Sequence, residues 1–192
     1  MILQAVCDYK YIIRDVNIGW PGRVHDARVF GNSDLFRRGE EGTLFPNWTK
    51  SVALAEREIV LPVMLLGDPA YPLKPWLMKP YSHRGQLSDI QQQFNYRLSR
   101  ARMTIENTFG RLKGRWRRLL KQMDQDKDFV CKVIATCIVL HNICEMRHEA
   151  YEDFDGNCEN LREAARVEPV GVDRSGKRIR DDIASAFAEN VV

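Results

Sequence analysis

Two acidic residues stand where a carboxylate could do chemistry. Asp68 follows the apolar run from Ile59 to Leu66, which the sequence predicts to be a strand buried on both faces. A side chain at the carboxyl end of a strand projects into a crevice while its backbone stays fixed, so an acid there makes a rigid metal ligand. The alternative is an ordinary turn residue, because Gly-Asp-Pro is common turn chemistry.

Glu106 is the only acid between residues 95 and 121, a segment that holds nine lysines and arginines. Such a cluster predicts a surface for nucleic-acid phosphates, because each neutralised phosphate releases counterions. The alternative is a solvated helix face that binds nothing. Glu106 adjoins Ile105 of an apolar stripe, so it can point inward to a site that the basic side chains surround. The candidate DNA-binding residues are Arg97, Arg100, Arg111, Lys113, Arg115, Arg117 and Arg118.

Two histidines also lie next to polar residues. Asp26, which follows His25, could act as a ligand or a general base, or it could be a helix N-terminal acid that interacts with the helix dipole. The pair His141 and Asn142 stands inside an apolar segment. For this pair, a buried polar role satisfied by backbone groups competes with a ligand role.

Composition excludes several classes of protein. The chain has 192 residues, 44% of them hydrophobic and 29% charged, with a net charge of +3, which is the balance of a globular domain. Five cysteines without a CxxC pair favour neither a disulfide framework nor a zinc ribbon, and they predict a reducing compartment. The longest apolar runs are far shorter than the roughly 20 residues that cross a bilayer, so we expect no membrane-spanning segment and no membrane partner.

The first half of the chain predicts short elements. Extended segments at 2–6 and 11–18 form a hairpin, and a helix or helical turn follows over 25–36, where Asn32, Ser33 and Asp34 can cap a second short helix. Residues 37–58 are expected to be a surface connection, and 71–88 an irregular, anchored loop.

The second half predicts longer helices. Residues 90–121 carry the stripe of one amphipathic helix, with a break near 110–114 because of two glycines. A helix over 129–146 is apolar nearly all round and should be buried. Beyond residue 147 the hydrophobicity falls, so 148–192 are expected to be a weakly ordered, charged tail.

Several of these segments together resemble a known family. QAVCD (4–8), WPGRVHDARVF (20–30), GDPAYPLKPWLMKPY (67–81), RMTIENTFGRLKGRWRRL (102–119) and IVLHNICE (138–145) are similar to the PIF/Harbinger transposases and the Harbinger transposase-derived nucleases, a group of DDE superfamily endonucleases. The resemblance covers about residues 1–147. It implies an α/β, ribonuclease H-like fold, in which a mixed sheet flanked by helices carries three carboxylates that bind two Mg²⁺ or Mn²⁺ ions.

The resemblance also assigns residues. Asp68 matches the second catalytic acid of the family and Glu106 the third, so both are expected to be catalytic and to bind metal. The segment that carries the first acid, of Asp-Gly-Thr-His type, lies upstream of QAVCD in the family and is absent here together with its strand. Asp26 matches a separate Pro-Gly-x-x-His-Asp motif and is a further candidate metal ligand.

Two functions remain open at this point. The first is a metal-dependent DNA nuclease or transposase-derived domain over 1–147 that cleaves phosphodiester bonds and is incomplete as given. The alternative is a non-catalytic transposon-derived fragment, or a module that binds DNA or protein. The resemblance implies DNA and a Myb/SANT-like protein as partners. It also implies a nuclear location, with the cytoplasm as the alternative.

Overall fold

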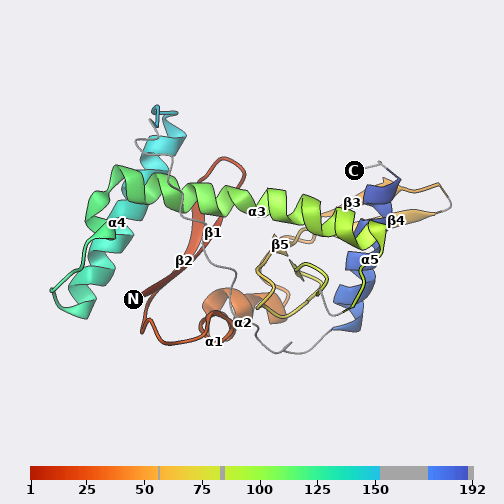
Figure 1. Ribbon diagram of the computed structural model, residues 1–192, viewed down its shortest axis with the longest axis horizontal. Helices are drawn as coiled ribbons and strands as arrows, with labels where there is room; N and C mark the ends of the chain where they lie inside the picture. Colours follow the sequence, from red (N-terminus) through yellow and green to blue (C-terminus); the bar gives the residue numbers. More distant parts are fainter. Residues whose placement is uncertain (56, 83–84, 152–172, 190–192) are drawn as a thin grey trace. The chain divides into compact units, whose positions relative to one another are not determined.

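A computed structural model describes residues 1–55, 57–82, 85–151 and 173–189, which combine helices with short strands (Figure 1). The described residues fall into two compact units. Unit 1 lies within Met1–His25 and Met103–Glu163, and unit 2 lies within Asp26–Arg102 and Ala164–Val192. The described strands pair only in twos, so one mixed sheet of ribonuclease H type is not seen, and that fold remains a prediction.

Unit 1 begins with the predicted hairpin. Strands β1 (Ile2–Cys7) and β2 (Ile13–Trp20) pair antiparallel, with Ala5 opposite Val16, which confirms this prediction. Strand β2 contacts helix α4 (Lys127–Met146), and a short 3₁₀ helix, η1 (Arg117–Leu120), precedes α4. The core of the unit consists of side chains from β2, helix α3 (Asp89–Arg115) and α4: Ile13, Leu112, Val130, Ile134, Cys137 and Ile138.

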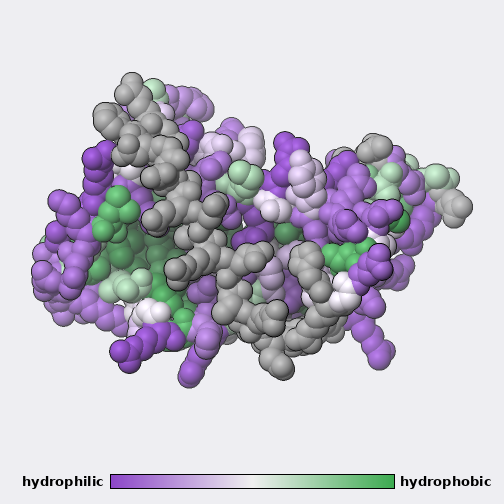
Figure 2. All heavy atoms as spheres, viewed as in Figure 1, coloured by the Kyte–Doolittle hydropathy of each residue, from purple (hydrophilic) through white to green (hydrophobic). Residues whose placement is uncertain are grey.

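Helix α4 is less buried than its composition predicts. Val139 is 58% exposed and Leu140 41%, so the expectation of burial all round is wrong. The reason is that only one side of the helix packs in unit 1, and Figure 2 shows hydrophobic side chains on the surface where α4 and the hairpin lie. Among the described residues, α4 is also the one helix whose length and composition would allow it to cross a membrane, a test that the core helix of a soluble protein passes as well.

Unit 2 opens with two short helices, as predicted. Helix α1 (Asp26–Gly31) is followed by α2 (Asp34–Glu40), and the Ser33 hydroxyl caps α2 by accepting the Phe36 N–H. The expected connection over 37–58 instead contains strand β3 (Thr49–Ala53). β3 pairs antiparallel with β4 (Glu58–Pro62), and the directly opposed Val52 and Ile59 are both buried, so they pack on one face of this hairpin.

The predicted strand over 59–66 is divided into two. β4 ends at Pro62, and β5 (Leu65–Leu66) pairs in parallel with β6 (Leu77–Met78) within the loop that follows. Val60 is 58% exposed, so the run is not buried on both faces. An unbroken apolar run hid this division, because Val63 and Met64 are as apolar as the strands on either side.

Helix α3 (Asp89–Arg115) is the long helix that the periodicity predicts, and it supplies residues to both units. It continues through Gly110 and ends just after Gly114, so the predicted break is displaced to Trp116. Gly114 has a packing role, because a Cβ there would lie 2.1 Å from the Tyr151 hydroxyl oxygen. The glycine therefore admits the tyrosine to the helix surface.

The expectation of a weakly ordered tail is wrong for residues 174–188. They form helix α5 (Arg174–Ala188), which buries Ile183 and Ala184 against Leu73, Met78 and Phe94 in the core of unit 2. Charged residues fill the outer face of α5 and lower the average hydrophobicity, while its apolar residues share one face. Residues 152–172, also placed in the tail, lie outside the described residues.

Candidate functional site

Asp68 lies at the carboxyl end of β5, where the sequence predicts it. The Gly67 N–H donates to the Met78 oxygen at 2.8 Å and continues the pairing of β5 with β6 up to the acid. A Cβ on Gly67 would lie 2.9 Å from a Leu77 methyl carbon and 3.0 Å from the Tyr71 ring. A side chain at this position would require Leu77 and Tyr71 to shift, so the loop packs closely over Gly67.

Both carboxylate oxygens of Asp68 accept hydrogen bonds within unit 2. Oδ1 accepts the Ala70 N–H at 3.0 Å, and Oδ2 accepts Arg102 Nη2 at 3.0 Å. The first bond is turn chemistry, so the turn interpretation of Asp68 is confirmed locally. It does not use up the carboxylate, because the side chain of Asp68 remains 28% exposed. Asp68 is thus a fixed acid that solvent and solutes can reach.

Glu106 and Asp26 are both exposed. Glu106 is on α3, four residues or about one turn after Arg102. Asp26 is in the first turn of α1, where an acid interacts favourably with the helix dipole. The roles predicted for Asp68, Glu106 and Asp26 in metal binding stay predictions.

The basic residues of α3 and η1 differ in their surroundings. Arg97 stacks on Phe187 with its guanidinium carbon 4.6 Å from the ring centroid, and Arg100 lies 5.8 Å from the Tyr96 centroid. Lys113, Arg117 and Arg118 are exposed, and Arg118 donates to the Gln125 amide oxygen at 2.8 Å. Arg111 and Arg115 instead turn toward an acid on α4.

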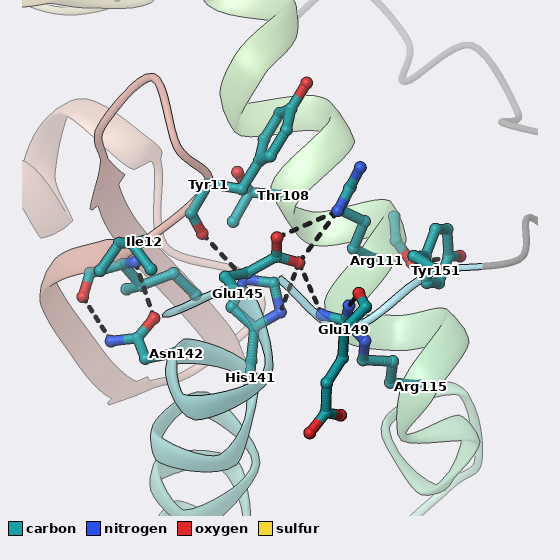
Figure 3. Close-up of polar contacts among 12 residues, drawn as sticks. Tyr11, Ile12, Thr108, Arg111, Arg115, His141, Asn142, Glu145, Glu149 and Tyr151 are labelled. Atoms are coloured by element: carbon teal, nitrogen blue, oxygen red, sulfur yellow. Dashed lines mark hydrogen bonds and ion pairs between the residues drawn. The ribbon is translucent and has the colours of Figure 1, made fainter. Parts of the chain in front are cut away.

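That acid is Glu145, which sequence reasoning did not single out (Figure 3). Its carboxylate accepts Arg115 Nη1 at 2.6 Å and Arg111 Nη1 at 3.0 and 3.1 Å, and its side chain is only 7% exposed. The Arg111 guanidinium also lies over the Tyr11 ring, 4.3 Å from its centroid, and both arginines lie 5.4 Å from the Tyr151 ring centroid. These two arginines therefore join α3 to α4, and they are not free for phosphate.

The electrostatics of this network follow from burial and charge. Burial by itself raises the pKa of Glu145, but the hydrogen bonds from Arg115 and Arg111 outweigh it, so the pKa lies below its ordinary value. Burial lowers the pKa of His141, whose ring is fully enclosed and whose Nδ1 lies 4.0 Å from a Glu145 oxygen. Glu145 is thus a buried anion, and His141 is neutral at pH 7.

The prediction of a buried polar pair satisfied by backbone groups is confirmed in part. His141 is fully buried and Asn142 half-buried, and both bind backbone groups, but His141 Nδ1 has no hydrogen-bond partner among the described residues. His141 Nε2 lies 2.9 Å from the backbone carbonyl oxygen of Tyr11. Asn142 accepts the Ile13 N–H at 2.9 Å and donates to the Ile13 oxygen at 2.8 Å, which completes the backbone hydrogen bonds at the start of β2. The pair attaches the hairpin to α4.

Comparison with known proteins assigns the family. The family described as DDE superfamily endonuclease matches residues 1–142. The chain belongs to this family. It is 34% identical over 156 residues to "Protein ALP1-like" of Arabidopsis thaliana, covering 80% of this chain and 37% of the relative. It is 29% identical over 145 residues to "Putative nuclease HARBI1" of Homo sapiens, covering 72% of this chain and 35% of that relative. No solved structure matches.

The DDE family implies divalent metal, and the residues fit that group only in part. Carboxylates such as Asp68 and Glu106 are the right donors for Mg²⁺ or Mn²⁺. Within the described ranges, however, no three His, Cys, Asp or Glu side chains are grouped so that they could hold an ion. The described residues therefore show no assembled two-ion centre.

Sequence reasoning missed Arg102 and Lys79 as well as Glu145. Arg102 was counted among nine similar basic residues, and only the fold shows that it binds Asp68. Lys79 stands in a loop, yet its side chain is buried against the Asp68 turn. For Glu145 a signal was available, because it follows His141 by one helical turn on the buried face of an apolar helix.

Proposed function

We propose that this DDE-family chain supplies part of a metal-dependent DNA endonuclease domain, in which Asp68 and Glu106 are two of the metal-binding carboxylates. The observation that carries the proposal is the family match over residues 1–142, a range that contains GDPAYP and IENTFG, combined with the two-point anchoring of the partly exposed Asp68 carboxylate. When bound, divalent ions in such a centre polarise the scissile phosphate and activate the attacking oxygen.

Arg102 has a definite role in this proposal. Its ion pair fixes Asp68 on the side that faces α3 and lowers the cost of holding a carboxylate in one orientation. A metal ion bound through Oδ2 of Asp68 would compete with Arg102 for the lone pairs of that oxygen. Removal of Arg102 should therefore change metal affinity as well as the mobility of Asp68.

The chain spans 37% and 35% of the two relatives described above, so the activity of a whole protein is part of the proposal. We expect the 192-residue chain to nick supercoiled DNA weakly or not at all in Mg²⁺. A longer chain that includes an upstream Asp-Gly-Thr-His type segment should nick it. Asp68→Asn in the longer chain should abolish nicking. Robust nicking by the short chain that disappears in Asp68→Asn would show that other residues complete the centre.

A second function is favoured by exposed basic residues. Lys113, Arg117 and Arg118 are exposed at the end of α3 and in η1, where they could contact DNA phosphates without any cleavage. DNA binding that survives Asp68→Asn would support this non-catalytic role. The nuclear location and a Myb/SANT-like partner belong to the proposal and await localisation and pull-down experiments.

A further inference from the structure

Lys79 is a buried lysine directly beside the Asp68 turn. The residue is 9% exposed, and its Nζ donates to the backbone carbonyl oxygens of Tyr71 at 2.6 Å and of Pro69 at 3.2 Å. The same turn is closed by the Tyr71 N–H, which donates to the backbone carbonyl oxygen of Asp68 at 3.0 Å. Lys79 therefore binds backbone carbonyl groups of the same turn whose Ala70 N–H binds the Asp68 carboxylate.

The strand pairing brings Lys79 to this place. Met78 pairs with Leu66 in the parallel pair β5 and β6, so Lys79 leaves β6 at the edge where Gly67 and Asp68 leave β5. Burial lowers the pKa of the Lys79 ammonium, the Arg180 charge lowers it further, and the Asp68 charge acts in the opposite direction. Asp68 is thus the acid that offsets the charge of this buried lysine.

Helix α5 fixes the residues that follow Lys79. The Arg180 guanidinium carbon lies 3.9 Å from the Tyr81 ring centroid, and its Nη1 donates to the Pro80 oxygen at 3.4 Å. The Tyr81 hydroxyl donates to Asp181 at 2.6 Å. Asn95 of α3 exchanges two hydrogen bonds with the Tyr81 backbone, at 2.8 and 3.0 Å. Lys79 is therefore anchored by β6 on one side and by α5 and α3 on the other.

We propose that Lys79 is a positioning residue that holds the Asp68 carboxylate in place, and that α5 maintains Lys79 in that role. The inference deepens the proposed function, on which its significance for metal binding rests. It extends the working site to a helix beyond residues 1–142, the part of the chain that matches the family. Removal of the Lys79 ammonium, or of the contacts of α5 with Tyr81, should make the turn from Pro69 to Tyr71 more mobile while the rest of unit 2 stays folded.

Amide hydrogen exchange measured by NMR tests this directly. Lys79→Met keeps the apolar stem and removes both donors, so exchange of the Ala70 and Tyr71 amides should become about tenfold faster or more. Amides of Val52 and Ile59 in the β3–β4 hairpin should change less than about twofold. Tyr81→Phe, which removes the hydroxyl that binds Asp181, should accelerate the same loop amides by about threefold. Lys50→Met, at an exposed lysine of β3, is the matched control and should change neither set.

The outcomes separate this inference from the proposed function. Unchanged exchange of Ala70 and Tyr71 in a folded Lys79→Met protein would overturn the positioning role. Addition of Mn²⁺ should broaden the Ala70 signal in the native chain, and affinity should fall about tenfold in Lys79→Met. Faster exchange without any Mn²⁺ effect in the native chain would support positioning and reject metal binding at Asp68.

A second measurement applies if Lys79→Met does not fold. In the native chain, the ammonium protons of Lys79, identified by their loss in Lys79→Arg, should exchange at least about tenfold more slowly than those of Lys50, because two carbonyl groups hold them in a buried position. Equal exchange rates would show that Lys79 does not bind the turn in solution.

Discussion

Asp68 and Glu145 are both carboxylates that bind arginines of α3, yet their surroundings differ. Asp68 has one arginine partner, a backbone N–H and a side chain that is 28% exposed. Glu145 has two arginine partners and a side chain that is 7% exposed. The first acid keeps a surface that a solute can reach, and the second is enclosed by its partners.

The difference separates a candidate functional acid from a structural one. A buried acid with two guanidinium partners has its lone pairs engaged, and its removal leaves two partly buried cations without their acid. A partly exposed acid with one partner costs little to free and can exchange that partner for a metal ion. The same helix, α3, thus supplies one arginine that orients Asp68 and two that stabilise unit 1.

The largest expected effect is on the buried acid. Glu145→Gln should lower the free energy of unfolding by about 3 kcal/mol, because Arg111 and Arg115 would remain without a counter-charge. Urea unfolding measures this change. Glu106→Gln, at an exposed acid of α3, is the control and should leave the unfolding free energy nearly unchanged. Equal effects of the two substitutions would show that the ion pairs of Glu145 do not stabilise unit 1.

Acid should act on the same network. The pKa of His141 is lowered in the folded protein, so the unfolded chain takes up the proton first and stability declines as the pH falls below about 6.5. The pKa of Glu145 is also lowered, so its contribution is complete above about pH 4.5 and is lost as the pH falls through the folded pKa.

Thermal unfolding between pH 7 and pH 3 measures this decline. In Glu145→Gln the part below about pH 4.5 should be smaller than in the native chain. If His141→Gln retains the decline that begins near pH 6.5, another group is responsible for it.

A smaller effect is expected for Asp68. Asp68→Asn should cost about 1 kcal/mol or less, since its ion pair with Arg102 is partly solvated. A double-mutant cycle of Asp68→Asn with Arg102→Met should give a coupling energy below that of Glu145→Gln with Arg115→Met. The reverse order would make Asp68 the more structural of the two acids.

The smallest effect on stability is expected at the exposed basic residues. Lys113→Gln with Arg118→Gln should leave unfolding nearly unchanged, and if DNA binds there the slope of log affinity against log salt should fall by about 1 for each phosphate contact removed. Arg115→Gln should instead lower stability, because Arg115 belongs to the Glu145 network. An unchanged salt slope in the double variant would show that this surface is only solvated.

The sequence predicts local structure well where one signal dominates. The hairpin, the Ser33 cap and the long helix α3 follow from alternation, capping chemistry and periodicity. The binding of the His141 and Asn142 side chains to backbone groups also follows, because an apolar helix leaves polar side chains few other partners.

Features that depend on partners distant in sequence were not predicted. Nothing near Glu145 in the sequence shows that Arg111 and Arg115 reach it from another helix. Helix α5 was not predicted for a related reason, because its apolar face becomes part of a core only by packing against Leu73 and Phe94, which are distant in sequence. The identity of Asp68 as a candidate came from its place after a strand, but its exposure and its partners came from the fold.

Metal binding by Asp68 and Glu106 is tested most directly by titrating Mn²⁺ into the native chain and three single variants. Electron paramagnetic resonance detects the free and bound Mn²⁺. We expect Asp68→Asn and Glu106→Gln each to weaken binding by about tenfold or more, because each removes one of two carboxylate donors. Glu40→Gln, at an exposed acid of α2, should bind as the native chain does. Binding that is equal in all four proteins would contradict a metal-binding role for Asp68 and Glu106.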